Sequence, residues 1–268
     1  MHLKRIITGL VALPFLIYLI AKGGLAFFIL VLIAGLLALW EYLKIICARP
    51  PRPAVSVLNI LALIMAAFIL WAAFKARFDF IVLILAADVV LAGIAALVRY
   101  PVDKAVFDAV VKQAAGLLYV PVLLGHILML RNGTDGMIWV FLLISLVFSN
   151  DIGAFYAGTF FGKHKLCPAV SPGKTIEGSL GGLSACFAVG IAFRGFLFPG
   201  LHWGLFLLTV FCIGIAGPAG DLFESVIKRG GNIKDSGNIL PGHGGLLDRI
   251  DALLFATPVA YMCKTFLF

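Results

Sequence analysis

Residues 80–98 read FIVLILAADVVLAGIAALV, and Asp88 is the one ionisable side chain among them. A helix needs about 20 mostly apolar residues to cross the hydrocarbon core of a bilayer. Other segments of the chain have a similar length and a similar apolar character. Together they predict nine membrane spans, at roughly 6–21, 25–43, 54–74, 80–98, 113–130, 137–160, 178–198, 203–224 and 250–267.

The composition of the whole chain agrees with this prediction. Hydrophobic residues make up 62% of the chain and charged residues 13%, whereas a soluble domain has about 25% charged residues. We therefore expect an all-α, polytopic integral membrane protein. The formal net charge of +8 is assigned to loop lysines and arginines that set topology and meet anionic lipid headgroups. No nucleic acid partner is expected.

The distribution of positive charge predicts the orientation of the chain. With a cytoplasmic N-terminus, the nine spans place 15 of the 21 lysines and arginines on the cytoplasmic side. This excess is what the positive-inside rule requires. The loops 161–177 and 225–249 then face the cytoplasm. We expect a bacterial inner (plasma) membrane protein with its site on the cytoplasmic face.

The chain divides into two regions according to where its site-forming charges lie. The candidate residues all follow residue 149 or so. Residues 1–135 are therefore predicted to be N-terminal helices that serve as scaffold, lipid contact or dimer interface. Residues 136–268 are predicted to be the catalytic region with its cytoplasmic loops. Asp88 and His126, inside spans of the first region, are interpreted as structural.

A polar segment near the C-terminus concentrates charge of both signs. Residues 221–251 contain five of the thirteen acidic residues of the chain and one of its five histidines. Asp221, Glu224 and Lys228 are spaced so that they share one face of a helix. Asp248 and Asp251 share a face near the start of the next helix. Ionisable groups at membrane depth are costly and are by default candidates for function.

Two interpretations of these acids remain open from spacing alone. Carboxylates on two neighbouring helices could converge on Mg²⁺, which takes one or two protein carboxylates and keeps positions for water and phosphate. Alternatively they form interfacial salt bridges, Asp221 with Lys228 and Asp248 with Arg249.

The turn 241–245 reads PGHGG and precedes the last predicted helix. Its glycines let backbone N–H groups approach an anion, and a helix N-terminus favours phosphate. Lys228, Arg229 and Lys234 supply positive charge nearby. Acidic metal ligands and basic phosphate ligands in one segment indicate phosphoryl or nucleotidyl transfer.

A second polar patch comprises Asn150, Asp151 and the segment 171–178, SPGKTIEG. Its Gly-Lys-Thr resembles part of a P-loop. That motif needs an earlier glycine, which residues 166–171 lack, and a preceding strand where we expect a membrane span. We interpret the segment as a cytoplasmic loop whose Ser, Lys and Thr donate hydrogen bonds to phosphates.

Segment 225–251, SVIKRGGNIKDSGNILPGHGGLLDRID, resembles the 27-residue signature of the phosphatidate cytidylyltransferase (CDP-diacylglycerol synthase) family. The stretches 150–155 (NDIGAF), 161–166 (FGKHKL) and 171–178 are also similar to that family. One departure is Asn150, where family members often have alanine. The resemblance covers residues of about 149–256.

The resemblance implies a reaction and its partners. CTP and phosphatidate would give CDP-diacylglycerol and pyrophosphate, with Mg²⁺ required and a monovalent cation such as K⁺ as a second cation. It also implies contact with membrane lipids and a homodimer.

The resemblance and the polar pattern together assign roles to the candidate residues. The predicted metal ligands are Asp221, Asp248 and Asp251. The predicted catalytic residues are these three with Lys228, Arg229, Lys234, Asp235 and His243. The predicted substrate-binding residues are Asp151, Ser171, Lys174, Thr175, Glu177, Ser225, Gly242, Gly244, Gly245 and Arg249.

Two other functions compete with this one. A CTP-dependent lipid-alcohol kinase would transfer the γ-phosphoryl group and release CDP. A transporter or flippase would be expected to carry its charges near the midplane of the membrane, whereas the charges predicted here gather at one face.

Overall fold

The computed structural model describes residues 13–46, 53–237 and 244–268. It is an all-α polytopic membrane protein, and eight helical stretches of the described chain are long and apolar enough to cross a bilayer. The helices are α2 (Gly24–Ile46), α3 (Pro53–Phe74), α4 (Phe78–Arg99), α5 (Val106–Leu117), α6 (Leu123–Asn132), α7 (Gly136–Phe161), α8 (Ile176–Phe196), α9 (Trp203–Gly230) and α10 (Leu247–Leu267).

The predicted spans from 25–43 onward are confirmed, with ends that differ by a few residues in most cases. The first candidate, 6–21, lies partly outside the described residues, and its remainder belongs to a helical segment Leu13–Lys22. The largest difference is the span predicted at 113–130, which covers Val106–Asn132. Here α5 and α6 are joined by a π-helical turn, η1 (Leu118–Val122), that contains Pro121. A π-turn accommodates a proline, which has no N–H to donate to the helix ladder.

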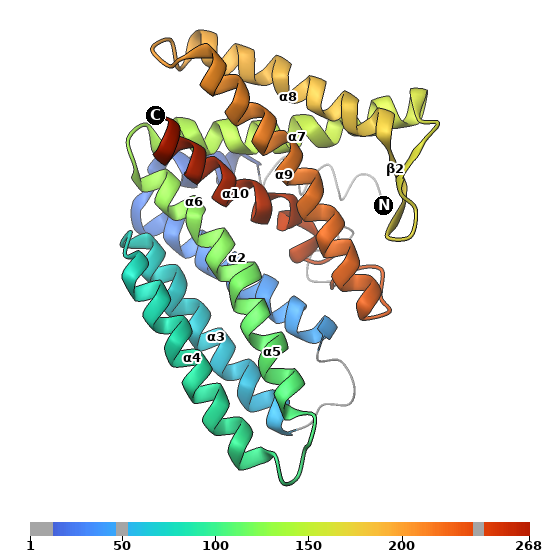
Figure 1. Ribbon diagram of the computed structural model, residues 1–268. Helices are drawn as coiled ribbons and strands as arrows, with labels where there is room; N and C mark the ends of the chain where they lie inside the picture. The colour runs from blue at the N-terminus through green and yellow to red at the C-terminus, as the bar shows by residue number, and fades with distance from the viewer. Residues whose placement is uncertain (1–12, 47–52, 238–243) are drawn as a thin grey trace.

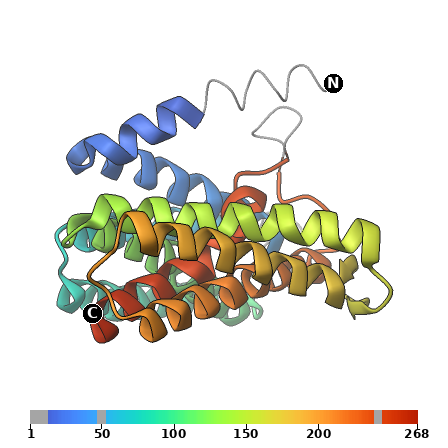
Figure 2. The same cartoon turned by 90° about the horizontal axis from the view of Figure 1, so that it is seen from above.

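A small β-hairpin stands where the sequence predicted a loop. Strands β1 (Lys165–Cys167) and β2 (Ser171–Thr175) pair antiparallel between α7 and α8. Figures 1 and 2 place the hairpin at one end of α7 and α8, which run side by side. The C-terminus lies at the opposite end of this pair.

Small residues let α7 and α8 approach closely. A Cβ atom on Gly182 would lie 2.3 Å from the Asn150 side-chain oxygen, and one on Gly181 would lie 2.2 Å from the Ala157 Cβ atom. A Cβ atom on Gly153 would lie 2.7 Å from the Gly181 carbonyl oxygen. Stripes of small residues are how membrane helices bring their backbones together. This contact fixes where α7 and the hairpin stand relative to each other.

Helix α9 is fastened to α7 at a proline. Pro218 cannot donate to the carbonyl four residues earlier, so the Gly214 carbonyl loses its usual helical partner. The buried side chain of Asn150 donates to this carbonyl through Nδ2 at 2.7 Å. Helix α9 continues through Pro218 to Gly230.

The contacts of Asp88 and His126 are consistent with the structural interpretation. Asp88 is buried and accepts a hydrogen bond from Gln113 Nε2 on α5 at 2.7 Å. His126 Nδ1 lies 2.8 Å from the Val122 carbonyl, and its ring packs against Phe78 and Tyr261. Both groups join helices of the bundle.

We predict that Gly182→Ala destabilises the protein by about 1–3 kcal/mol, because the new methyl group would overlap Asn150 and force α7 and α8 apart. Thermal unfolding in detergent would measure the loss. The matched control is Gly195→Ala on the same helix, where an added Cβ meets nothing within 4 Å. Equal melting temperatures for the two variants would contradict the close packing of α7 on α8.

Candidate functional site

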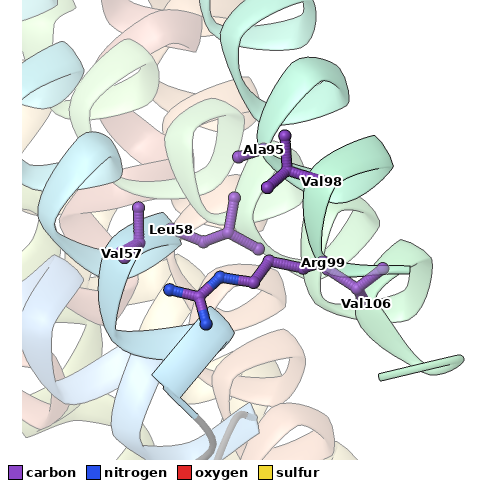
Figure 3. Close-up of a pocket in the computed structure, with 6 residues that line it drawn as sticks. All are labelled: Val57, Leu58, Ala95, Val98, Arg99 and Val106. Carbon is purple, nitrogen blue, oxygen red and sulfur yellow. The ribbon is translucent and has the colours of Figure 1, made fainter. Parts of the chain in front are cut away.

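Two hollows in the described structure differ in their chemistry. The smaller, of about 190 Å³, lies between α3, α4 and α5 and is lined mostly by aliphatic side chains. In Figure 3 its one charged residue, Arg99, extends beside Val57 and Leu58. The larger, of about 490 Å³, is lined by two carboxylates, those of Asp151 and Asp221, and by Lys174. The larger hollow is therefore the candidate site.

The larger hollow, called here the polar cleft, is built by four elements. Helix α7 contributes one wall, the hairpin and the start of α8 a second, and α9 a third. Its lining comprises Asn150, Asp151, Ala154, Phe155, Gly158, Thr159, Gly173, Lys174, Thr175, Gly178, Ser179, Pro218 and Asp221. Asp221, the first residue of the C-terminal polar segment, thus meets Asp151 and Lys174 of the second polar patch in one cleft.

An ion pair joins the hairpin to α9 across the polar cleft. Lys174 Nζ lies 2.7 Å from Asp221 Oδ2 and donates to the Pro218 carbonyl at 3.3 Å. Strand β2 carries Lys174 to this position, and α9 presents Asp221 immediately after the Gly217-Pro218-Ala219-Gly220 segment. The salt-bridge interpretation of the sequence paired Asp221 with Lys228. In the structure, Asp221 pairs with Lys174 instead.

A second charged cluster lies further along the same face of α9. Lys228 Nζ contacts the buried Glu224 carboxylate one turn earlier and Asp248 Oδ1 of α10 at 2.8 Å. The Lys228 ammonium group thus stands between the carboxyl groups of Glu224 and Asp248. The predicted common face of Asp221, Glu224 and Lys228 is consistent with both clusters.

The second oxygen of Asp248 organises the loop between α9 and α10. Asp248 Oδ2 accepts hydrogen bonds from the backbone N–H groups of Ser236, at 3.0 Å, and Gly245, at 2.9 Å. Gly244, with φ of +80°, brings the chain back beside this carboxylate. An L-residue rarely adopts that conformation. Asp248 thereby ties the two ends of the loop together.

The third predicted metal ligand, Asp251, lies near the other acids. Its carboxylate is within electrostatic range of Asp221, Asp151 and Lys228. A Cβ atom on Gly220 would lie 2.5 Å from the Asp251 carbonyl, so α9 and α10 cross closely at this level. Among the described residues, no group of three or more His, Cys, Asp or Glu side chains is arranged as a metal site. The three-carboxylate metal site stays a prediction.

Two predicted substrate-binding residues, Thr175 and Glu177, and the predicted catalytic residue Arg229 position the hairpin in this structure. Thr175 is buried and caps α8, because its Oγ1 accepts from Gly178 N at 3.1 Å. The Glu177 carboxylate accepts from the N–H groups of Lys163 and His164 and contacts the His164 ring. Arg229 Nε donates to the Val170 carbonyl at 3.3 Å. These contacts hold the hairpin against the ends of α7 and α9.

The remaining predicted residues fall into three groups. Gly242 and His243 lie outside the described residues. Lys234, Asp235 and Arg249 are exposed, whereas Ser171 and Ser225 are half-buried, on β2 and α9. Their functional roles stay predictions.

Sequence reasoning missed one site-adjacent residue in the first region of the chain. Glu41, on α2, is 1% exposed. Its Oε2 atom accepts from Leu247 N at 2.7 Å and from Ser236 Oγ at 3.1 Å. An isolated glutamate inside an apolar span was the signal that could have revealed it. The region 1–135 thus contributes a side chain directly to the α9–α10 loop.

The arrangement brings carboxylates and ammonium groups close together. Carboxylate oxygens of Asp151, Asp221, Asp248 and Asp251 suit a hard divalent cation. Lys174 and Lys228 now neutralise two of these carboxylates and could turn to an anionic ligand once a metal replaces them. Such a site neutralises charge on a polyphosphate, which is the main requirement of phosphoryl and nucleotidyl transfer.

Comparison with known proteins agrees with this chemistry. Residues 3–267 match the cytidylyltransferase family. A phosphatidate cytidylyltransferase of Bacillus subtilis is 32% identical over 265 residues, which cover 96% of each chain. A phosphatidate cytidylyltransferase of Staphylococcus haemolyticus is 42% identical over 51% of this chain and 52% of its own length. An uncharacterised protein, YnbB of Escherichia coli, is 42% identical over 56% of this chain and 47% of its own length.

We predict that Lys174→Met loosens the hairpin. A partly exposed ion pair contributes up to about 1 kcal/mol, so amide hydrogen exchange in β2 should accelerate roughly fivefold. Hydrogen–deuterium exchange with mass spectrometry would measure it. The control is Lys165→Met, at an exposed position on the same hairpin. Unchanged exchange in Lys174→Met would show that the ion pair does not hold the hairpin.

Proposed function

We propose, because this chain belongs to the cytidylyltransferase family, that it transfers the cytidylyl group of CTP to phosphatidate and forms CDP-diacylglycerol and pyrophosphate in phospholipid synthesis. The observation that carries the proposal is the near full-length similarity to a phosphatidate cytidylyltransferase. Lys174 of β2 and Lys228 of α9 lie beside carboxylates along α9, and such a reaction needs both kinds of charge.

The reaction is a displacement at phosphorus. An oxygen of the phosphatidate phosphate forms a bond to the α-phosphorus of CTP. The bond from that phosphorus to the oxygen bridging to the β-phosphate breaks, and pyrophosphate leaves with the electron pair. The attacking phosphate is already ionised near neutral pH, so it needs orientation and charge neutralisation more than a strong base.

The carboxylates of α9 and α10 are of the chemical type that binds a divalent cation. The Lys174 ammonium group lies 2.7 Å from the Asp221 carboxylate, and the Lys228 ammonium group lies 2.8 Å from the Asp248 carboxylate. Carboxylate oxygens are the donors that Mg²⁺ prefers. Asp221, Asp248 and Asp251 would hold Mg²⁺, and K⁺ would serve as a second cation. Bound Mg²⁺ would neutralise charge on the triphosphate.

The basic residues then bind the phosphates. Lys228, Arg229 and Lys234, around the end of α9, would contact the triphosphate and the departing pyrophosphate. Lys174, on the hairpin, would contact the phosphatidate headgroup or the nucleotide. The backbone N–H groups of the 241–245 turn would complete the phosphate site.

Access to the site follows from the surface of α7. Phe155 lines the polar cleft and is 67% exposed, and Phe160, one and a half turns further on, is 73% exposed. These rings would meet acyl chains, so phosphatidate would enter from the bilayer while CTP enters from water. The site would face the cytoplasm of a bacterial inner membrane, and a second copy of the chain would complete a homodimer.

A measurement with α-³²P-labelled CTP, phosphatidate and Mg²⁺ on the purified protein tests the function. We expect label in a chloroform-soluble lipid, because the α-phosphorus joins the product, and loss of that label with EDTA. Label recovered in water-soluble CDP would instead indicate a lipid-alcohol kinase. Untouched CTP from a well-folded sample would favour a transporter.

We predict that Asp248→Asn lowers the rate of CDP-diacylglycerol formation by roughly 10²–10³-fold, because the site loses an anionic oxygen donor assigned to the divalent cation that neutralises the phosphates. The matched control is Asp108→Asn, which removes an exposed carboxylate paired with Lys112 on α5. Both variants should purify as folded, membrane-inserted protein. Near-normal turnover of Asp248→Asn would remove Asp248 from the site.

A further inference from the structure

The α9–α10 loop is held from below by a helix of the scaffold region. Helix α2 ends beneath this loop, and Gly231 packs so closely on Ile45 that an added Cβ would lie 2.7 Å from the Ile45 side chain. One turn earlier, Glu41 reaches between the two ends of the loop. Figure 1 shows the end of α2 beneath the region where α9 ends and α10 begins.

The Glu41 carboxylate has a built environment. Its Oε2 atom accepts from the Ser236 hydroxyl at the start of the loop and from the backbone N–H of Leu247 at its end. Cβ atoms on Gly237 and Gly245 would lie 2.4 Å and 2.6 Å from its oxygens. Glycine at these two positions is therefore what lets the loop close around the carboxylate.

This contact also completes the start of α10. The first N–H groups of a helix lack partners within the helix, and Leu246, at the N-cap, provides no side-chain cap. Glu41 provides one from another helix, through the Leu247 N–H. A negative charge at this end is further favoured by the helix dipole. Asp248 stands in the first turn of the helix that Glu41 caps.

Ser236 connects the two carboxylates. Its backbone N–H donates to Asp248 Oδ2, and its hydroxyl donates to Glu41 Oε2. A displacement of the loop at Ser236 would therefore disturb both acids together. The segment between Ser236 and Gly245 includes the glycine turn assigned to the phosphates.

We infer that Glu41 is a positioning residue of the nucleotidyl-transfer site, which holds Ser236 and the first turn of α10 so that Asp248 is correctly placed. It touches no reacting atom and acts through Ser236, Leu247 and Asp248. The inference rests on the proposed function, because it assigns Asp248 to the reaction.

The test compares Glu41→Gln, Ser236→Ala and the double variant in the CDP-diacylglycerol assay. Glu41→Gln keeps the shape of the side chain but weakens its hydrogen bonds, so we expect a loss of roughly 10–100-fold in kcat/KM for CTP. We expect a higher apparent KM for CTP as part of that loss. Because the hydroxyl of Ser236 acts through Glu41, the double variant should lose no more than Glu41→Gln alone.

Asp88→Asn is the matched control. Asp88 is also a buried acid of the first region, 2% exposed, and it bonds Gln113 far along the chain from the loop. If Glu41 had a merely structural role, the two variants would lose melting temperature and activity in proportion. We expect Asp88→Asn to keep the wild-type KM for CTP at any temperature where it is folded.

The outcomes separate the inference from the function it rests on. Wild-type CTP kinetics in folded Glu41→Gln, or defects of Glu41→Gln and Ser236→Ala that multiply, would overturn the positioning role. Failure of the wild-type protein to label phosphatidate would overturn the function itself. Full activity of Asp248→Asn beside impaired Glu41→Gln would break the proposed link through Asp248.

Discussion

Charge compensation inside an apolar bundle is the constraint on which this site depends. A charge removed from water needs an opposite charge and hydrogen bonds to remain there. Lys228 meets that requirement by standing between Glu224 and Asp248, which joins α9 to α10. Lys174 does the same for Asp221 and joins the hairpin to α9. The elements that carry the site are thus held together by the charges that give the site its chemistry.

The apolar packing sets the distances over which those charges meet. Glycines at the α7–α8 contact bring the two backbones together, and the hairpin that connects them carries Lys174 to α9. On the other side, α2 supports the loop between α9 and α10 through Ile45 and Glu41. Region 1–135 therefore packs directly against the charged region 136–268 at this end of the molecule, although most of the site-forming charges belong to region 136–268.

Hydropathy alone predicted the spans because length and apolar content decide whether a helix crosses a bilayer. Spacing predicted the common face of Asp221 and Lys228, since helical periodicity is local. The partners across helices were not predictable, because Lys174 reaches Asp221 only through the crossing of α8, α9 and the hairpin. The hairpin itself was missed because its strands are short and polar. Glu41 was missed because one acid barely changes the mean hydropathy of its span.

The bond between Asn150 and the Gly214 carbonyl has a mechanical consequence for α9. One backbone hydrogen bond of α9 is missing at Pro218, and the Asn150 side chain of α7 donates to the Gly214 carbonyl in its place. A helix bends most easily where one of its backbone hydrogen bonds is missing. Pro218 therefore divides α9 into two segments that can tilt relative to each other. The segment toward Trp203 packs in the apolar bundle, and the segment toward Gly230 carries Asp221, Glu224 and Lys228. A tilt of the segment toward Gly230 would move all three charged side chains together, while the segment toward Trp203 kept its position.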